Sequence, residues 1–90
     1  MTSSPYPLDP NYVIDKFAEM EQSVLEIYSY CVFNSSSQLP QEYINGEVQK
    51  QIIFLEEQLQ LTLVKTAGRS LTTFTTALQI ANNYLETHPL

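Results

Sequence analysis

The sequence has little glycine, cysteine or positive charge, and it has no tryptophan. Two glycines among 90 residues cannot supply a glycine-rich loop that cradles phosphates. The single cysteine, Cys31, has no partner for an internal disulfide. No apolar run approaches the roughly 20 residues that span a bilayer, so we expect no membrane-spanning segment.

The basic residues are too few and too scattered to hold a nucleic-acid backbone. Four of them stand against ten acidic residues, which gives a net charge of −6 at pH 7. A phosphate-binding surface needs clustered Lys and Arg, and an anionic membrane surface repels an acidic protein. We therefore expect neither direct nucleic-acid binding nor membrane binding. An acidic charge balance does suit a basic partner.

The N-terminal segment, MTSSPYPLDP, has neither the basic nor the apolar part of a secretory signal. Together with the lone cysteine, this favours a reducing compartment, and we expect a cytoplasmic protein. Residues 1–8 carry Pro5 and Pro7 among small polar side chains and are predicted to form a flexible arm. Residues 9–90 are predicted to form a single helical domain.

The first helix is predicted over residues 10–33. Asp9 and Pro10 are typical of a helix start, because aspartate accepts free backbone N–H groups and proline suits the first turn. Apolar residues then recur at alternating spacings of four and three, as in the seam between packed helices: Val13, Phe17, Met20, Val24, Ile27 and Cys31. Further residues widen this face enough for two neighbours: Ile14, Ala18, Leu25, Tyr28 and Val32. Glu21 interrupts the wider part, where it either pairs with a base across an interface or, as we favour, extends into water.

The second helix is predicted over residues 40–67. Asn45-Gly46 is a strong turn signal, so this helix starts either at Pro40 or only at Glu47. Its central part is apolar on two nearly opposite faces. The first face consists of Val48, Ile52, Leu55, Leu59 and Leu63. The second face consists of Ile53, Phe54, Leu61 and Val64, extended toward the N-terminus by Tyr43.

The third helix is predicted over residues 70–87, and the role of Gly68 before it decides the fold. If Gly68 ends the second helix, the chain is an all-α, small three-helix bundle, which is the arrangement that we favour. If the helix continues through Gly68, at a cost of about 1 kcal/mol, the chain is a helical hairpin with one long second arm. The hairpin leaves part of its apolar seam uncovered and so must dimerise or bind a partner.

The residue types used in catalysis and metal binding form no recognisable motif. His88 has no second His and no Cys beside it, so we interpret it as a frayed terminal residue rather than a metal ligand. Cys31 lies on the apolar seam, where burial raises the pKa of a thiol. Glu56 and Glu57 are adjacent and point in different directions, so they do not form a carboxylate pair for acid–base chemistry. We expect no enzyme activity, no cofactor and no metal site.

The two-sided second helix is the main indication of function. In a closed three-helix bundle, both neighbours of a helix lie on one side of it, so the opposite face is free for another chain. A flatter packing, with this helix between the other two, would instead use both faces. Large apolar side chains contribute about 1.5–3 kcal/mol each when fully buried, so a few of them can form an interface core.

We therefore predict a non-catalytic protein–protein interaction module, a small helical subunit or adaptor that self-associates or joins a larger complex. The predicted partner interface is the second face with its extension: Ile53, Phe54, Leu61, Val64 and Tyr43. The alternative is an acidic inhibitor of a basic nucleic-acid-binding protein, with Asp15, Glu19 and Glu26 in the place of phosphates. The identity of the partner and the number of copies in an assembly stay open.

Overall fold

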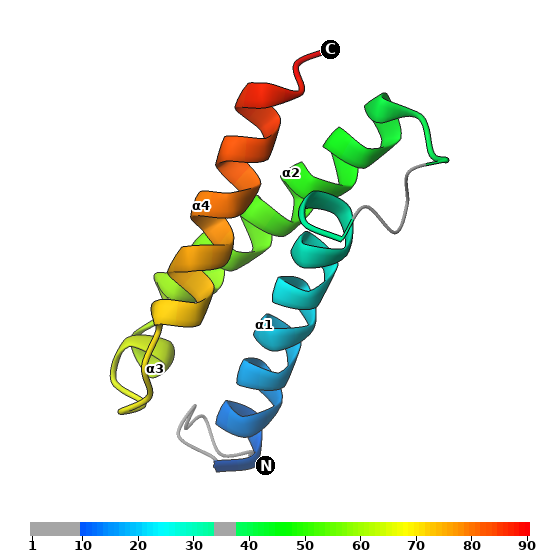
Figure 1. The fold of residues 1–90 in the computed structure, drawn as a ribbon. Coiled ribbons are helices and arrows are strands. Elements are labelled where there is room, and N and C mark those ends of the chain that lie inside the picture. Colours follow the sequence, from blue (N-terminus) through cyan, green and yellow to red (C-terminus); the bar gives the residue numbers. More distant parts are fainter. Residues whose placement is uncertain (1–9, 34–37) are drawn as a thin grey trace.

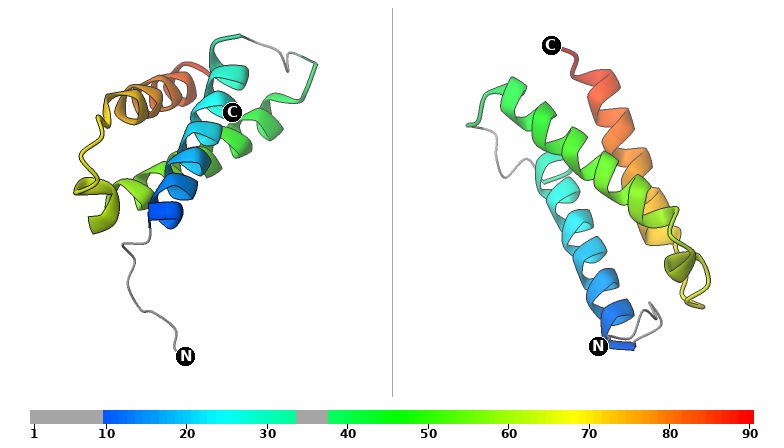
Figure 2. Two further views of the ribbon diagram at one scale, coloured as in Figure 1. Left: turned by 90° about the horizontal axis from the view of Figure 1, so that it is seen from below. Right: turned by 180° about the vertical axis from the view of Figure 1, so that it is seen from behind.

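The computed structural model describes residues 10–33 and 38–90, over which the chain forms four helices. They are α1 (Pro10–Cys31), α2 (Gln41–Leu59), α3 (Thr62–Lys65) and α4 (Thr72–Thr87). The three long helices all contact one another. Figure 1 shows α1 and α4 running in the same direction, and Figure 2 shows from behind that α2 lies across both. The predicted all-α three-helix bundle is confirmed, with α3 as a short addition between α2 and α4.

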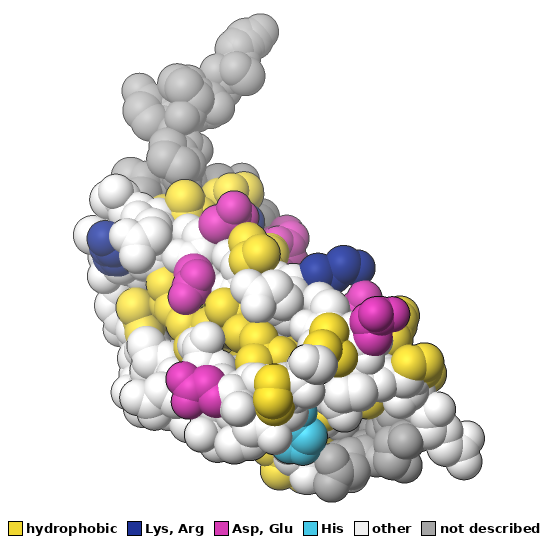
Figure 3. Space-filling view, turned by 90° about the horizontal axis from the view of Figure 1, so that it is seen from above, with side chains coloured by type: hydrophobic (Ala, Val, Ile, Leu, Met, Phe, Trp, Pro, Cys, Tyr) yellow, Lys and Arg dark blue, Asp and Glu magenta, His cyan; other side chains and the backbone are white. Residues whose placement is uncertain are grey.

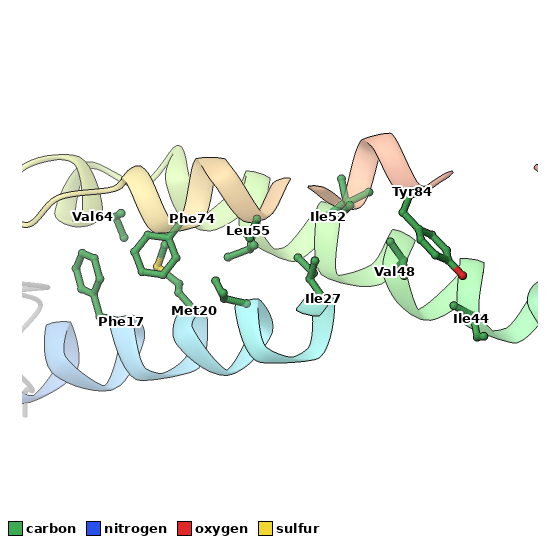
Figure 4. Packing of buried hydrophobic residues seen from close by; sticks show 13 residues of the cluster. Phe17, Met20, Ile27, Ile44, Val48, Ile52, Leu55, Val64, Phe74 and Tyr84 are labelled. Atoms are coloured by element: carbon green, nitrogen blue, oxygen red, sulfur yellow. The ribbon is translucent and has the colours of Figure 1, made fainter. Parts of the chain in front are cut away.

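α1 agrees closely with the first predicted helix. It begins at Pro10, as predicted, and ends at Cys31 rather than at residue 33. The four central seam residues of α1 are buried against the other helices, and the two end ones, Val13 and Cys31, are partly buried. Phe17, Met20 and Ile27 point into the core (Figure 4). The predicted flexible arm, residues 1–8, lies outside the described residues.

α2 runs through Asn45-Gly46 without interruption, so the earlier of the two predicted starts is right. The Asn45 amide nitrogen donates to the carbonyl oxygen of His88 at 2.8 Å, and its amide oxygen accepts from Gln41 Nε2 at 2.7 Å. The side chain before Gly46 is thus engaged in contacts that a turn would break. A glycine inside a helix costs only about 1 kcal/mol relative to alanine. Burial of the neighbouring Ile44 favours the helix as well.

The predicted end of the second helix, at residue 67, is wrong. α2 ends at Leu59, and Leu61 is extended, with φ of −71° and ψ of 134°, before α3 starts. No glycine or proline marks this break, and no side chain caps the start of α3. The break redirects the chain so that Val64, in α3, is completely buried in the core.

The alternative arrangement, a hairpin with one long second arm through Gly68, is also wrong. Gly68 has a φ of +78°, in the left-handed region that ends helices and favours glycine. The chain then returns as α4, which begins at Thr72 rather than at residue 70 and ends at Thr87 as predicted. Phe74 of α4 meets Phe17 of α1, with ring centroids 5.9 Å apart. α4 therefore covers the seam that the hairpin would have left open.

The core extends along the bundle from Phe17 and Val64 at one end to Tyr84 and Ile44 at the other (Figure 4). It takes residues from all four helices. The buried hydrophobic residues are Phe17, Met20, Val24, Ile27, Ile44, Val48, Ile52, Leu55, Val64, Phe74, Ala77, Ala81 and Tyr84.

Candidate interaction surface

The residues of the predicted partner interface do not share one surface. Val64 is completely buried in the core and is therefore unavailable to a partner. Phe54 and Leu61 are partly buried and pack against the core. Ile53 and Tyr43 are exposed, at 48% and 49%. Of the predicted interface, only these two residues of α2 point mainly to solvent.

The end of α2 at Leu59 explains most of this difference. The second face assumes one straight helix through residue 64, and the break before α3 removes Leu61 and Val64 from that face. Ile53 and Tyr43 are ten residues apart, about 15 Å along a helix, so they form no continuous patch.

Tyr43 also takes part in the packing of α2 against α1. Its hydroxyl group lies close enough to Tyr30 of α1 to influence the Tyr30 phenol. Burial raises the pKa of Tyr30, and the neighbouring Tyr43, Glu26 and Glu47 raise it further. Tyr43, one of the two exposed residues of the predicted interface, therefore lies next to α1 of the same chain.

A longer exposed apolar surface lies on α1. We define the α1 stripe as Ile14, Ala18, Leu25 and Val32. All four side chains are exposed, and the three larger ones are exposed by 61%, 57% and 46% in chain order. Their spacings of four and seven residues place them on one face of the helix. Val32 follows the last residue of α1 and keeps its helical phase, because its N–H donates to the carbonyl of Tyr28.

The sequence contains a direct signal for the α1 stripe. Each stripe residue immediately follows a residue of the seam, in the pairs Val13-Ile14, Phe17-Ala18, Val24-Leu25 and Cys31-Val32. The sequence predicts that these residues widen the apolar face of the first helix, but it assigns the partner interface to the second. In the bundle, α2 and α4 cover the seam of α1 and leave the stripe uncovered.

An aromatic pair extends the stripe at its C-terminal end. The rings of Tyr28 and Phe33 meet edge to face, with centroids 6.2 Å apart. Phe33 is exposed, whereas Tyr28 is half-buried against the core. The aromatic rings therefore add apolar surface next to Val32.

Glu21 lies within the stripe, between Ala18 and Leu25. Its carboxylate is 3.3 Å from Nη2 of Arg69, in the connection between α3 and α4. The Arg69 guanidinium also lies over the Phe17 ring, 4.2 Å from its centroid. The Glu21 side chain reaches water, as we favoured from the sequence, but its basic partner belongs to the same chain. Because both charged side chains are about half exposed, the pair adds at most about 1 kcal/mol.

Apart from the Glu21–Arg69 pair, the ionised groups next to the stripe are acidic. Asp15 follows Ile14, and Glu26 follows Leu25. Neither carboxylate forms an ion pair within residues 10–33 and 38–90. Figure 3 shows another view of the bundle surface, on which hydrophobic side chains lie among acidic and a few basic ones. The α1 stripe is thus an apolar strip with an acidic border.

The residues considered for chemistry are engaged in the fold. The His88 ring stacks on Tyr84 with centroids 4.0 Å apart, and its Nδ1 is 3.0 Å from the Tyr84 carbonyl oxygen. His88 therefore closes the end of α4 and is not a frayed residue. Cys31 is half-buried, and burial raises the pKa of its thiol to about 11. In the described part of the chain, no three His, Cys, Asp or Glu side chains come close enough together to hold a metal ion.

Comparisons at the level of the whole chain add no functional information. Among the described helices, none combines the length and the hydropathy that crossing a bilayer requires. Searches against family models, curated proteins and solved structures found no match to the chain.

Proposed function

We propose that the chain is a non-catalytic interaction module that binds another protein through the α1 stripe. The observation that carries this proposal is the row of exposed aliphatic side chains at helical spacing, outside a core that the chain closes by itself. Single exposed apolar residues are ordinary in soluble proteins. A row of them along one helix face is instead the pattern used in helix-on-helix contacts.

The energy available from the stripe is modest. A large aliphatic side chain gains about 1.5–3 kcal/mol on full burial. The large side chains of the stripe are already about half buried in the chain alone, so binding a partner adds about half of this energy for each of them. Ile14, Leu25 and Val32 together then contribute about 2–4.5 kcal/mol. A micromolar complex requires about 8 kcal/mol, so contacts at the border of the stripe must supply the rest.

Site-specific crosslinking tests the proposal. A photoreactive amino acid replaces Leu25 in one variant and Gln79, an exposed residue of α4, in a matched control. We expect a discrete adduct with another protein chain from position 25 and none from position 79, in the cells that make the protein. The proposal is overturned if position 25 gives no adduct, or if both positions give the same adducts.

The inhibitor predicted as the alternative differs in its response to salt. Binding through carboxylates weakens steeply as ionic strength rises, whereas binding through buried apolar surface changes little. The exposed aliphatic row favours the interaction module. Measuring the yield of the adduct at low and high salt separates the two.

A further inference from the structure

We infer that the α1 stripe binds a basic amphipathic helix, an inference that rests on the proposed function. The stripe is apolar on either side of the Glu21–Arg69 pair, and Asp15 and Glu26 border it without a basic partner in the described chain. The whole chain carries a net charge of −6. A partner with Lys or Arg beside an apolar seam complements both properties.

The shape of the stripe favours a helix as the bound element. Its residues lie on a single straight helix, α1, and continue for one residue beyond it with unchanged phase. From Ile14 to Val32 the stripe covers 18 residue steps, about 27 Å at 1.5 Å per residue. A partner helix of about 18 residues, or five turns, has the matching length.

A second copy of the chain fits the stripe less well, because it brings no free cation to the acidic border. Three of the four basic side chains are already in ion pairs, in the combinations Lys16–Glu19, Lys50–Glu47 and Arg69–Glu21. The fourth, Lys65, lies in the last turn of α3 and not on α1. Stripe-to-stripe contact would bring acidic borders together, and like charges in an interface oppose binding.

The border also sets the spacing of charges on the partner. Asp15 and Glu26 are 11 residues apart, which is about three helical turns and about 16 Å along the axis. The basic side chains of the partner helix should have the same separation. Charge pairs at the border raise the association rate and select the partner, while the stripe supplies the apolar contact.

Two synthetic peptides test the inference directly. Both have about 18 residues and the same leucine seam, interrupted by one glutamine at the position that faces the Glu21–Arg69 pair, but one has lysines on both flanks of the seam and the other has glutamates. Each is labelled with a fluorophore and titrated with the full chain, and binding is followed by fluorescence anisotropy. We expect the lysine peptide to bind at least about tenfold more tightly than the glutamate peptide, a difference of about 1.4 kcal/mol.

Matched variants show whether this binding occurs at the stripe. Leu25→Asp should weaken the lysine peptide at least about tenfold, while circular dichroism confirms that the helices are intact. The double variant Asp15→Asn/Glu26→Gln should weaken it severalfold. The control Glu56→Gln/Glu57→Gln changes the net charge equally, but on α2, and should leave binding unchanged.

Three results would overturn the inference. These are no binding of the lysine peptide, equal binding of the two peptides, and equal effects of the two double variants. Light scattering of the chain alone provides a further test, because a dimer that Leu25→Asp dissociates would make a second copy the occupant. If position 25 forms a crosslinked adduct but the peptides bind equally, the proposed function stands and the basic helix is refuted.

Discussion

Two adjacent isoleucines of α2 provide a sharp test of which face of this helix is covered. Ile52 is 4% exposed and Ile53 is 48% exposed. Replacing either by alanine removes the same atoms from the same helix, so the change in helix propensity cancels when the two variants are compared. A buried Ile→Ala substitution costs about 2–5 kcal/mol. At Ile53 the lost burial is worth about 1 kcal/mol, and the better helix propensity of alanine returns about 0.4 kcal/mol.

These differences are large compared with the stability of a domain of this size. At about 0.05–0.15 kcal/mol per residue, the free energy of unfolding is about 5–13 kcal/mol. One kcal/mol moves the midpoint of thermal unfolding by about 4–8 °C in such a domain. Ile52→Ala should therefore lower the midpoint by more than about 10 °C, and Ile53→Ala by less than about 5 °C.

Urea unfolding followed by circular dichroism measures both free energies, and repeating it at two protein concentrations detects association. Equal destabilisation by Ile52→Ala and Ile53→Ala would refute the reasoning, because it would mean that Ile53 is covered in solution. If the loss of unfolding free energy caused by Ile53→Ala increases with protein concentration, the outer face of α2 is an interface between copies of the chain. The assignment of the partner surface to α1 would then be wrong.

Further substitutions test single features of the bundle. Gly46→Ala should stabilise the chain by about 0.5–1 kcal/mol, since Gly46 is inside α2 and an added Cβ has no heavy atom within 4 Å. Gly68→Ala should destabilise the chain by about 1–2 kcal/mol, because Gly68 has a φ of +78°, where an alanine is strained. Urea unfolding that shows both glycine variants to be stabilised, or both to be destabilised, would contradict these two expectations. Tyr84→Phe removes the hydroxyl that accepts from Gln41 Nε2 at 2.9 Å, so we expect a loss of about 0.5–1.5 kcal/mol and faster hydrogen exchange near the end of α4. Exchange unchanged from the wild type would refute the hydrogen bond. The raised pKa of Cys31, about 11, means that its contribution to stability is complete below the unfolded pKa of 9.0 and is lost as pH rises through 11. Its reaction with a disulfide reagent at pH 8 should accordingly be slower than in the urea-unfolded chain, and equal rates would contradict the burial.

The sequence predicts α1 and α4 well because their signals are local and agree with one another. The start at Pro10 and the alternating seam of α1 specify one helix and one buried face. Residues 70–87 also carry apolar residues at spacings of three and four, at Leu71, Phe74, Leu78, Ala81 and Leu85, and α4 ends two residues after the last of them, at Thr87. The other helices cover the seam of α1, but they leave exposed four of the residues predicted to widen it. In α4, Phe74 and Ala81 are buried.

The break after Leu59 is not predictable from local signals. Residues 60–65 contain no proline or glycine, and neither Leu61 nor its neighbours caps a helix through a side chain. Burial of Val64 against the core is a tertiary contact that outweighs the local preference for a continuous helix. The predicted interface depended on the phase of that helix, so the loss of Leu61 and Val64 from it follows from the same break.

Glu21 interrupts the stripe near its middle. The Glu21–Arg69 pair divides the stripe into two short apolar segments, Ile14 with Ala18 and Leu25 with Val32. Each segment is smaller than the apolar patches that cause nonspecific association. Under the proposed function, a partner has to match the polar pair at the centre as well as both segments. A helix that is apolar along the whole contact would bury a charge pair without compensation. If the inferred basic helix is the partner, the residues that divide the exposed surface also favour a helix that is polar at its centre.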